Sequence, residues 1–151
     1  MALTLEELRA LLTAEEPNYP SLAKYLDAAT TPHLETLATS ADVMTASKAV
    51  YAASLSPDPG AQRLVAEASR SSARSVRLAA ASALTNLPDP VRNPIIERFL
   101  DDDADVAAQK LAIRSIRQTT SELSRKLTRI QRGTGLDSLR NLARQKLSEN
   151  P

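Results

Sequence analysis

The sequence predicts an all-α protein of about five antiparallel helix pairs that repeat roughly every 31 residues. Pro57-Asp58-Pro59 returns as Pro88-Asp89-Pro90, and Leu64-Val65 returns at the same interval as Ile95-Ile96. Two helices of about 11–13 residues and two short turns occupy roughly 30–35 residues, which is one antiparallel helix pair. Alanine is the commonest residue and aromatic residues make up 3% of the chain, and small alanines let helices pack closely.

The length of 151 residues fits one domain, which we expect to cover residues 1–151. Within it we expect an N-terminal cap pair at 1–30, three core repeats at 31–117, and a basic C-terminal helix pair at 118–151. The first and last pairs deviate from the repeat, as terminal repeats do when one side must face water.

Capping residues place the helices of the first half. Thr4 and Glu7 have the spacing of a capping box, which starts a helix that runs to about residue 14. The segment Pro17-Asn-Tyr-Pro20 breaks this helix, and Tyr25 belongs to the core face of the next one. The hydroxyl of Thr31, followed by proline, is expected to cap the third helix. Further helices are predicted to cover 21–29, 43–55, 61–71 and 75–87.

The second half follows the same rules. Asn93-Pro94 repeats the cap-then-proline pattern, and Thr119 or Thr120 caps a later helix. Gly133 is expected to stop that helix in a left-handed conformation. The bulkiest predicted core face consists of Ile95, Ile96, Phe99 and Leu100.

The acidic turn between residues 101 and 105 has two interpretations. Alternating aspartates are typical of the start of a calcium-binding loop, but the sixth position is Val106 instead of glycine and the twelfth is Ala112 instead of glutamate. Carboxylates at a helix N-terminus also complement its dipole, and we favour this capping role. His33 is the only histidine and has no cysteine or second histidine with which to share a zinc ion. We therefore predict no metal, no cofactor and no catalytic residues, and hence no enzyme.

Val76-Arg77, Ala80 and Leu84 follow a small-residue turn at the spacing of the second helix of a HEAT repeat, in its short bacterial form. The chain resembles this family over about residues 32–117, although Ala107 and Met44 replace the usual arginine in the other two copies. The resemblance implies a right-handed α-solenoid with a binding surface, and it names no partner.

Charge is unevenly distributed along the chain. Residues 1–105 contain 9 Lys/Arg and 15 Asp/Glu, whereas residues 106–151 contain 10 and 3. In the second part the basic residues recur at i, i+4 and i+7, which places them in rows on helix faces. The rows consist of Lys110, Arg114 and Arg117; Arg125, Arg129 and Arg132 with Lys126 beside them; and Arg140 with Arg144.

These rows have three interpretations: a solvated helix face, a surface for an acidic protein partner, or a contact with nucleic-acid phosphates. Together with the repeat, they predict a non-catalytic adaptor or scaffold that binds another protein. A nucleic-acid-binding module is the alternative, and the unequal charges also permit self-association. The sequence contains no apolar run long enough for a membrane span and no signal-peptide pattern, so we expect a cytoplasmic location.

Overall fold

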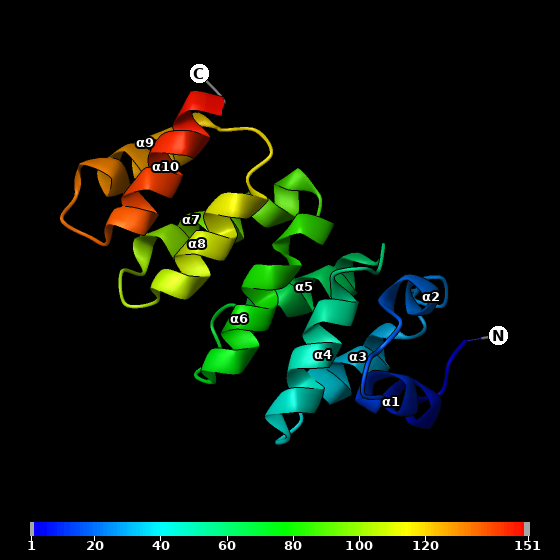
Figure 1. Cartoon of the computed structure of the whole chain (residues 1–151). Helices are drawn as coiled ribbons and strands as arrows, with labels where there is room; N and C mark the ends of the chain where they lie inside the picture. Colours follow the sequence, from blue (N-terminus) through cyan, green and yellow to red (C-terminus); the bar gives the residue numbers. More distant parts are fainter. Residues whose placement is uncertain (1, 150–151) are drawn as a thin grey trace. The chain divides into compact units, whose positions relative to one another are not determined.

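The computed structural model describes residues 2–149, and within them it contains ten α-helices, one short 3-10 helix and no strand (Figure 1). The all-α prediction is confirmed. None of the described helices combines the length and apolar character needed to cross a bilayer. The helices are α1 Leu5–Thr13, α2 Tyr19–Ala23, α3 Thr31–Ala38, α4 Val43–Ala53, α5 Pro59–Ala68, α6 Arg74–Ala83, η1 Leu84–Asn86, α7 Asp89–Asp101, α8 Val106–Ser115, α9 Ser121–Arg132 and α10 Asp137–Glu149.

The chain divides into two compact units, Met1–Leu87 and Pro88–Pro151. In the first unit, α3 packs on α4 and α5 packs on α6, and these two hairpins meet through α4 with α6 and α3 with α5. Helix α1 packs on α3 and α4, and α2 packs on α4. In the second unit, α7 packs on α8 and α9 on α10, with further contacts of α7 with α9 and α8 with α10.

The second helices of the four main hairpins are almost evenly spaced along the chain. They begin at Val43, Arg74, Val106 and Asp137. This spacing agrees with the period that the repeated Pro-Asp-Pro segments indicate in the sequence. Val43 precedes Val106 by the same offset as Arg74 precedes Asp137, and this offset is two periods. The helices α3–α6 and α7–α10 are thus two four-helix blocks with the same internal order and the same spacing.

Small side chains form the contact between the hairpins of the first unit. The buried face of α4 includes Ala46, Ala49 and Ala53, and that of α6 includes Ala80 and Ala83. Each of these alanines is at most 2% exposed. Because alanine adds little volume, it permits close approach of the two helix axes, and the interface tolerates added volume poorly.

Three predicted N-terminal caps are confirmed. Thr4 and Glu7 form both hydrogen bonds of the capping box. The Asp105 carboxylate accepts from the Ala108 amide, and the Thr120 hydroxyl accepts from the Leu123 amide. Each cap satisfies an amide that the first turn of a helix leaves without a partner.

The second helix is shorter than predicted and starts earlier. Asn18 caps α2 by accepting from the Ser21 amide, and Pro20 lies in its first turn. Proline does not break a helix there, because the amide it lacks would have no helical partner. The prediction for Tyr25 was also wrong, since this residue follows the helix and is 53% exposed. Tyr19 instead packs on Tyr51 of α4, with ring centroids 4.7 Å apart.

Two other predicted helix starts were wrong. Thr31 lies inside α3 and donates a hydrogen bond to Asp58, while Thr30 occupies the cap position without a side-chain cap bond. Helix α7 begins at Asp89, so Pro94 lies within it and Asn93 is not its cap. Pro94 has no amide hydrogen to donate to the carbonyl of Pro90, and Pro90 is an exposed residue. The predicted core face of α7 is nevertheless buried as expected.

Gly133 ends α9, but not in the predicted left-handed conformation. Its φ of −77° and ψ of −175° are extended. No described glycine has a positive φ. The chain therefore passes from the end of α9 directly into extended backbone at Gly133.

We expect Ala80→Leu to lower the free energy of unfolding by about 1–3 kcal/mol, because the added side chain overfills the buried α6 face. Chemical denaturation measures this change. Ser82→Leu adds leucine to the exposed side of the same helix and is the matched control, with an expected change within about 0.5 kcal/mol. Equal stability of the two variants would contradict the close packing of α6.

Candidate functional site

The first predicted basic row is shorter than its spacing suggested. Lys110 and Arg114 lie on α8, but α8 ends at Ser115 and the backbone becomes extended at Ile116, so Arg117 lies beyond the helix. Arg114 is exposed, and the side chains of Lys110 and Arg114 have no hydrogen bond or ion pair with another described residue. Arg117 lies near the buried Arg92, whose pKa is lowered by burial and further by the Arg117 charge.

Two cations of α9 bind the C-terminal end of α7. Lys126 Nζ lies 2.7 Å from both carboxylate oxygens of Asp101. Arg129 Nη2 donates to the Leu100 carbonyl at 2.8 Å and lies 3.4 Å from Asp101 Oδ1. A helix C-terminus has carbonyls without helical partners and a partial negative charge, so cations stabilise it. Both residues therefore have a structural role within the second unit.

Arg125 and Arg132, the other two arginines of the α9 row, differ in whether their side chains have a partner. Arg125 forms two hydrogen bonds with Glu122, the shorter of 2.6 Å, and these lower the pKa of the Glu122 carboxyl. Arg132 is exposed, and its side chain has no hydrogen bond or ion pair with another described residue. The row is therefore not a uniformly free basic surface.

The α10 pair is also bonded within its own unit. Arg140 donates to the Gln131 carbonyl at 3.3 Å and lies 3.4 Å from Asp137. Arg144 donates to the Asn141 side-chain oxygen at 3.2 Å. Among the described residues of the predicted rows, Lys110, Arg114, Arg132 and Arg144 have no carboxylate within ion-pair distance.

Two lysines that the sequence did not single out bind the ends of neighbouring helices. Lys146 of α10 donates to the carbonyl of Ile116, which follows α8, at 3.0 Å. Lys48 of α4 donates to the carbonyl of Ala14, which follows α1, at 3.2 Å. In both contacts a basic side chain donates to a carbonyl at the end of a neighbouring helix, as Arg129 of α9 does at the end of α7. The sequence holds no local signal for them, because each donor is separated from its acceptor by about one full repeat.

The carboxylates of the acidic turn point to separate partners. Asp102 accepts from the Ala104 amide and Asp103 from the Gln109 side chain, while Asp101 binds Lys126 and Asp105 caps α8. No three carboxylate or histidine side chains among the described residues converge as metal ligands would. These contacts support the capping interpretation of the turn.

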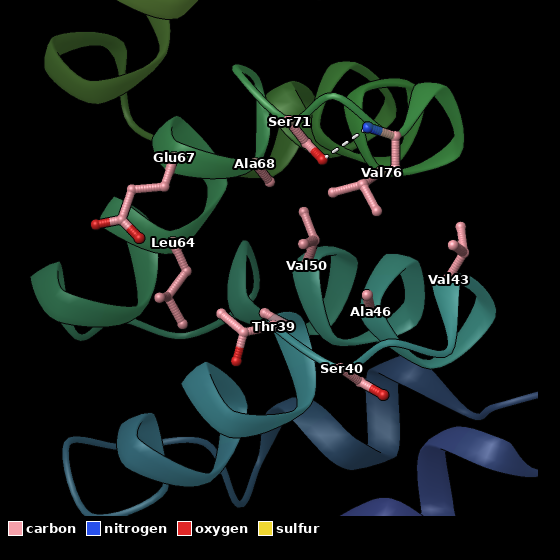
Figure 2. A pocket seen from close by; sticks show the side chains of 12 residues that line it. Thr39, Ser40, Val43, Ala46, Val50, Leu64, Glu67, Ala68, Ser71 and Val76 are labelled. Atoms are coloured by element: carbon pink, nitrogen blue, oxygen red, sulfur yellow. Dashed lines mark hydrogen bonds between the residues drawn. The ribbon is translucent and has the colours of Figure 1, made fainter.

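The first unit contains a groove of about 300 Å³ between its two main hairpins, which we call groove 1 (Figure 2). It lies where the C-terminal ends of α3 and α5 meet the N-terminal parts of α4 and α6. Figure 2 shows Val50 and Val76 facing each other across it. Its lining comprises Ala38, Thr39, Ser40, Val43, Ala46, Val50, Leu64, Glu67, Ala68, Ser71, Ala73 and Val76.

The polar groups of groove 1 differ in whether they have partners. The Ser71 hydroxyl accepts from the Ala73 amide at 3.1 Å, and the Ser40 hydroxyl accepts from the Asp42 amide. The Glu67 carboxylate has no hydrogen bond or ion pair with another described residue, and it stands at the edge, turned away from the valines (Figure 2). Groove 1 therefore combines an apolar floor with one unmatched negative charge.

The second unit contains an equivalent hollow of about 330 Å³, which we call groove 2. Seven of its ten lining residues stand two periods after a lining residue of groove 1, at the offset that separates Val43 from Val106. These seven are Asp103, Val106, Gln109, Ile130, Thr134, Leu136 and Leu139, which correspond to Ser40, Val43, Ala46, Glu67, Ser71, Ala73 and Val76.

The two grooves differ in chemistry at matched positions. Gln109 replaces Ala46 and donates to Asp103 and to the Leu100 carbonyl. Ile130 replaces Glu67. Arg129, also in the lining, binds Asp101. The charged groups of groove 2 thus have partners within their own unit, whereas groove 1 has the free Glu67 carboxylate.

No protein-family model matches this chain, and no curated protein matches it with significant similarity. Most residues of groove 1 are alanines, valines and serines, which are ordinary in helix cores and turns. Their one signal in the sequence is the offset of two periods that relates the two grooves.

We expect Arg129→Gln to lower the free energy of unfolding by about 1 kcal/mol, because it removes a charge-assisted hydrogen bond from the end of α7 at a half-exposed site. Arg114→Gln removes the same charge from an exposed position without such a bond, and should change stability by less than about 0.5 kcal/mol. Chemical denaturation compares the two. If both variants match the wild type, the capping role of Arg129 is wrong.

We expect Asp105→Ala to lower the free energy of unfolding by about 0.5–2 kcal/mol through loss of the α8 cap. Asp102→Ala, at an exposed position of the same turn, is the control with the smaller expected effect. Thermal unfolding with and without added CaCl2 separates the two interpretations. A calcium-dependent rise in Tm, lost in both variants, would instead support a calcium site.

Proposed function

We propose that this chain is a non-catalytic protein-interaction module, an adaptor or scaffold, that binds a segment of a partner protein in groove 1. This proposal rests on one observation: groove 1 combines an apolar floor with the Glu67 carboxylate, which has no partner among the described residues. The HEAT-like α-solenoid and a cytoplasmic location belong to the same proposal. The nearly even spacing of the starts of α4, α6, α8 and α10 supports the solenoid.

The chemistry of groove 1 indicates what it binds. Val43, which is 39% exposed, offers apolar contact to a side chain of a partner, with the buried Val50 and Val76 beneath it, and burying such side chains is the main favourable term in association. The hydroxyls of Ser40 and Ser71 already have backbone partners, so an apolar occupant leaves them satisfied. A basic residue of the partner beside Glu67 would supply the missing counter-charge. The proposed ligand is therefore a short segment with an apolar residue next to Lys or Arg.

The nucleic-acid alternative has weaker support. Three cations of its basic rows already have partners within the second unit. Lys126 and Arg129 bind the end of α7, and Arg125 pairs with Glu122. Lys110, Arg114, Arg132 and Arg144 remain, on three different helices or their ends. Phosphate binding would depend on these four, and its affinity would fall steeply with salt.

We expect Val43→Glu to reduce partner recovery at least about tenfold, since it places a charge in the apolar floor. The matched control is Val106→Glu, which changes the equivalent first residue of α8. Both residues directly follow an aspartate cap, where glutamate suits the helix dipole, so both variants should fold. Quantitative mass spectrometry of nuclease-treated pull-downs measures recovery, and circular dichroism verifies folding.

Glu67→Lys should weaken the same interaction, and a partner peptide with its basic residue reversed to glutamate should regain affinity for this variant. Equal recovery by wild type, Val43→Glu and Glu67→Lys would refute the groove proposal. Recovery that is abolished by nuclease and by Arg114→Gln with Arg132→Gln would favour the nucleic-acid alternative.

A further inference from the structure

We propose that this chain self-associates head to tail, with the turn between α9 and α10 of one copy docking on the α1–α2 hairpin of a second copy. The proposal is independent of groove 1. It depends on two surfaces that combine exposed apolar side chains with opposite charge. We call them the head, around Leu11 and Tyr25, and the tail, around Leu136.

The head is a small hollow on the first hairpin. Leu8 and Leu12 are buried on the inner face of α1, whereas Leu11 is 45% exposed. Tyr25, which follows the end of α2, is 53% exposed. Together with Leu22, Asn18 and Ser21, these residues line a depression of about 90 Å³. Large exposed apolar side chains that gather around a hollow are typical of interaction sites.

The hairpin that carries this hollow has an excess of negative charge. Residues 2–30 contain five Asp/Glu and two Lys/Arg. Glu6 pairs with Arg9, and Glu7 closes the capping box. Glu15 and Glu16 lie in the exposed connection between α1 and α2, and their side chains have no hydrogen bond or ion pair with another described residue. The head is therefore an apolar hollow on a hairpin whose connecting segment carries two carboxylates without a partner among the described residues.

The tail has the complementary character. Leu136 is 58% exposed in the turn that precedes α10. Arg132 ends α9 four residues earlier, and its exposed side chain has no partner among the described residues. Residues 118–149 contain seven Lys/Arg and three Asp/Glu. One turn thus presents a leucine and a free cation to a surface that offers a hollow and free carboxylates.

A second copy satisfies both surfaces at once, because the chain carries the two halves of the interface. Such a contact is heterologous: the head of each copy remains available after its tail is engaged. The interface is small and partly electrostatic, so we expect weak association that salt weakens further.

Sedimentation equilibrium of the full chain tests this proposal. The wild type should show an average mass that rises with concentration, and the association constant should fall several-fold between about 0.05 M and about 0.5 M NaCl. Tyr25→Glu and Leu136→Glu should each weaken self-association at least about tenfold. Met44→Glu removes an apolar side chain that is 63% exposed and belongs to neither surface, so it should associate as the wild type does.

Mixing the two variants gives the sharpest result. Tyr25→Glu retains only its tail and Leu136→Glu retains only its head. Each alone should therefore be monomeric, and an equimolar mixture should form a dimer but nothing larger. A wild type that remains monomeric at low salt up to about millimolar concentration, or a mixture that stays monomeric while the wild type associates, would overturn the proposal.

A charge reversal tests the orientation. In that mixture, adding Arg132→Glu to the Tyr25→Glu chain should weaken the dimer, and adding Glu15→Lys with Glu16→Lys to the Leu136→Glu chain should restore it. Absence of restoration, with each variant folded, would count against the pairing of these charges. Val43→Glu should self-associate normally, so failure of this proposal and failure of groove 1 are distinguishable.

Discussion

The close packing of α4 against α6 is the contact on which the first unit depends. Both helices bury faces rich in alanine, and this brings two hairpins together with little side-chain bulk. Small side chains also line much of groove 1. Ala46, Ala68 and Ala73 line it, and longer side chains at two of these places, Gln109 and Leu136, line groove 2 instead. The small residues that let the hairpins approach thus also contribute to the lining of groove 1, whose volume is similar to that of groove 2.

A second constraint concerns the carbonyls at helix C-termini. Arg140 of α10 binds the Gln131 carbonyl in the last turn of α9, and three more distant contacts follow the same pattern: Lys48 at α1, Arg129 at α7 and Lys146 at α8. Each of these three contacts spans roughly one repeat and joins helices of the same unit. Part of the positive charge in the second unit is therefore explained by folding, and only the remainder is available to a partner.

The helices and much of the core were predictable because they depend on local spacing and capping. Thr4 was identified as a cap from neighbouring residues alone, Thr120 was one of two candidates with Thr119, and Asp105 belongs to the turn that was assigned a capping role; the core face of α7 followed from helical periodicity. The errors at α2 and α7 arose because proline is compatible with the first turn of a helix, so Pro20 and Pro90 could lie inside their helices. The role of Arg129 was not predictable, because its acceptor lies on another helix. Groove 1 was hidden for a similar reason: its lining is ordinary helix-core sequence.

Hydrogen exchange of the full chain, free and in complex with its captured partner, tests the central claim most directly. The correspondence between the two grooves supplies an internal control, since both are measured in one sample. We predict slower exchange on binding in residues 38–50 and 64–76, which form groove 1, and unchanged exchange in the equivalent residues 101–113 and 127–139. Slower exchange around Arg114, Arg132 and Arg144, with none in the first unit, would contradict groove 1 as the binding site.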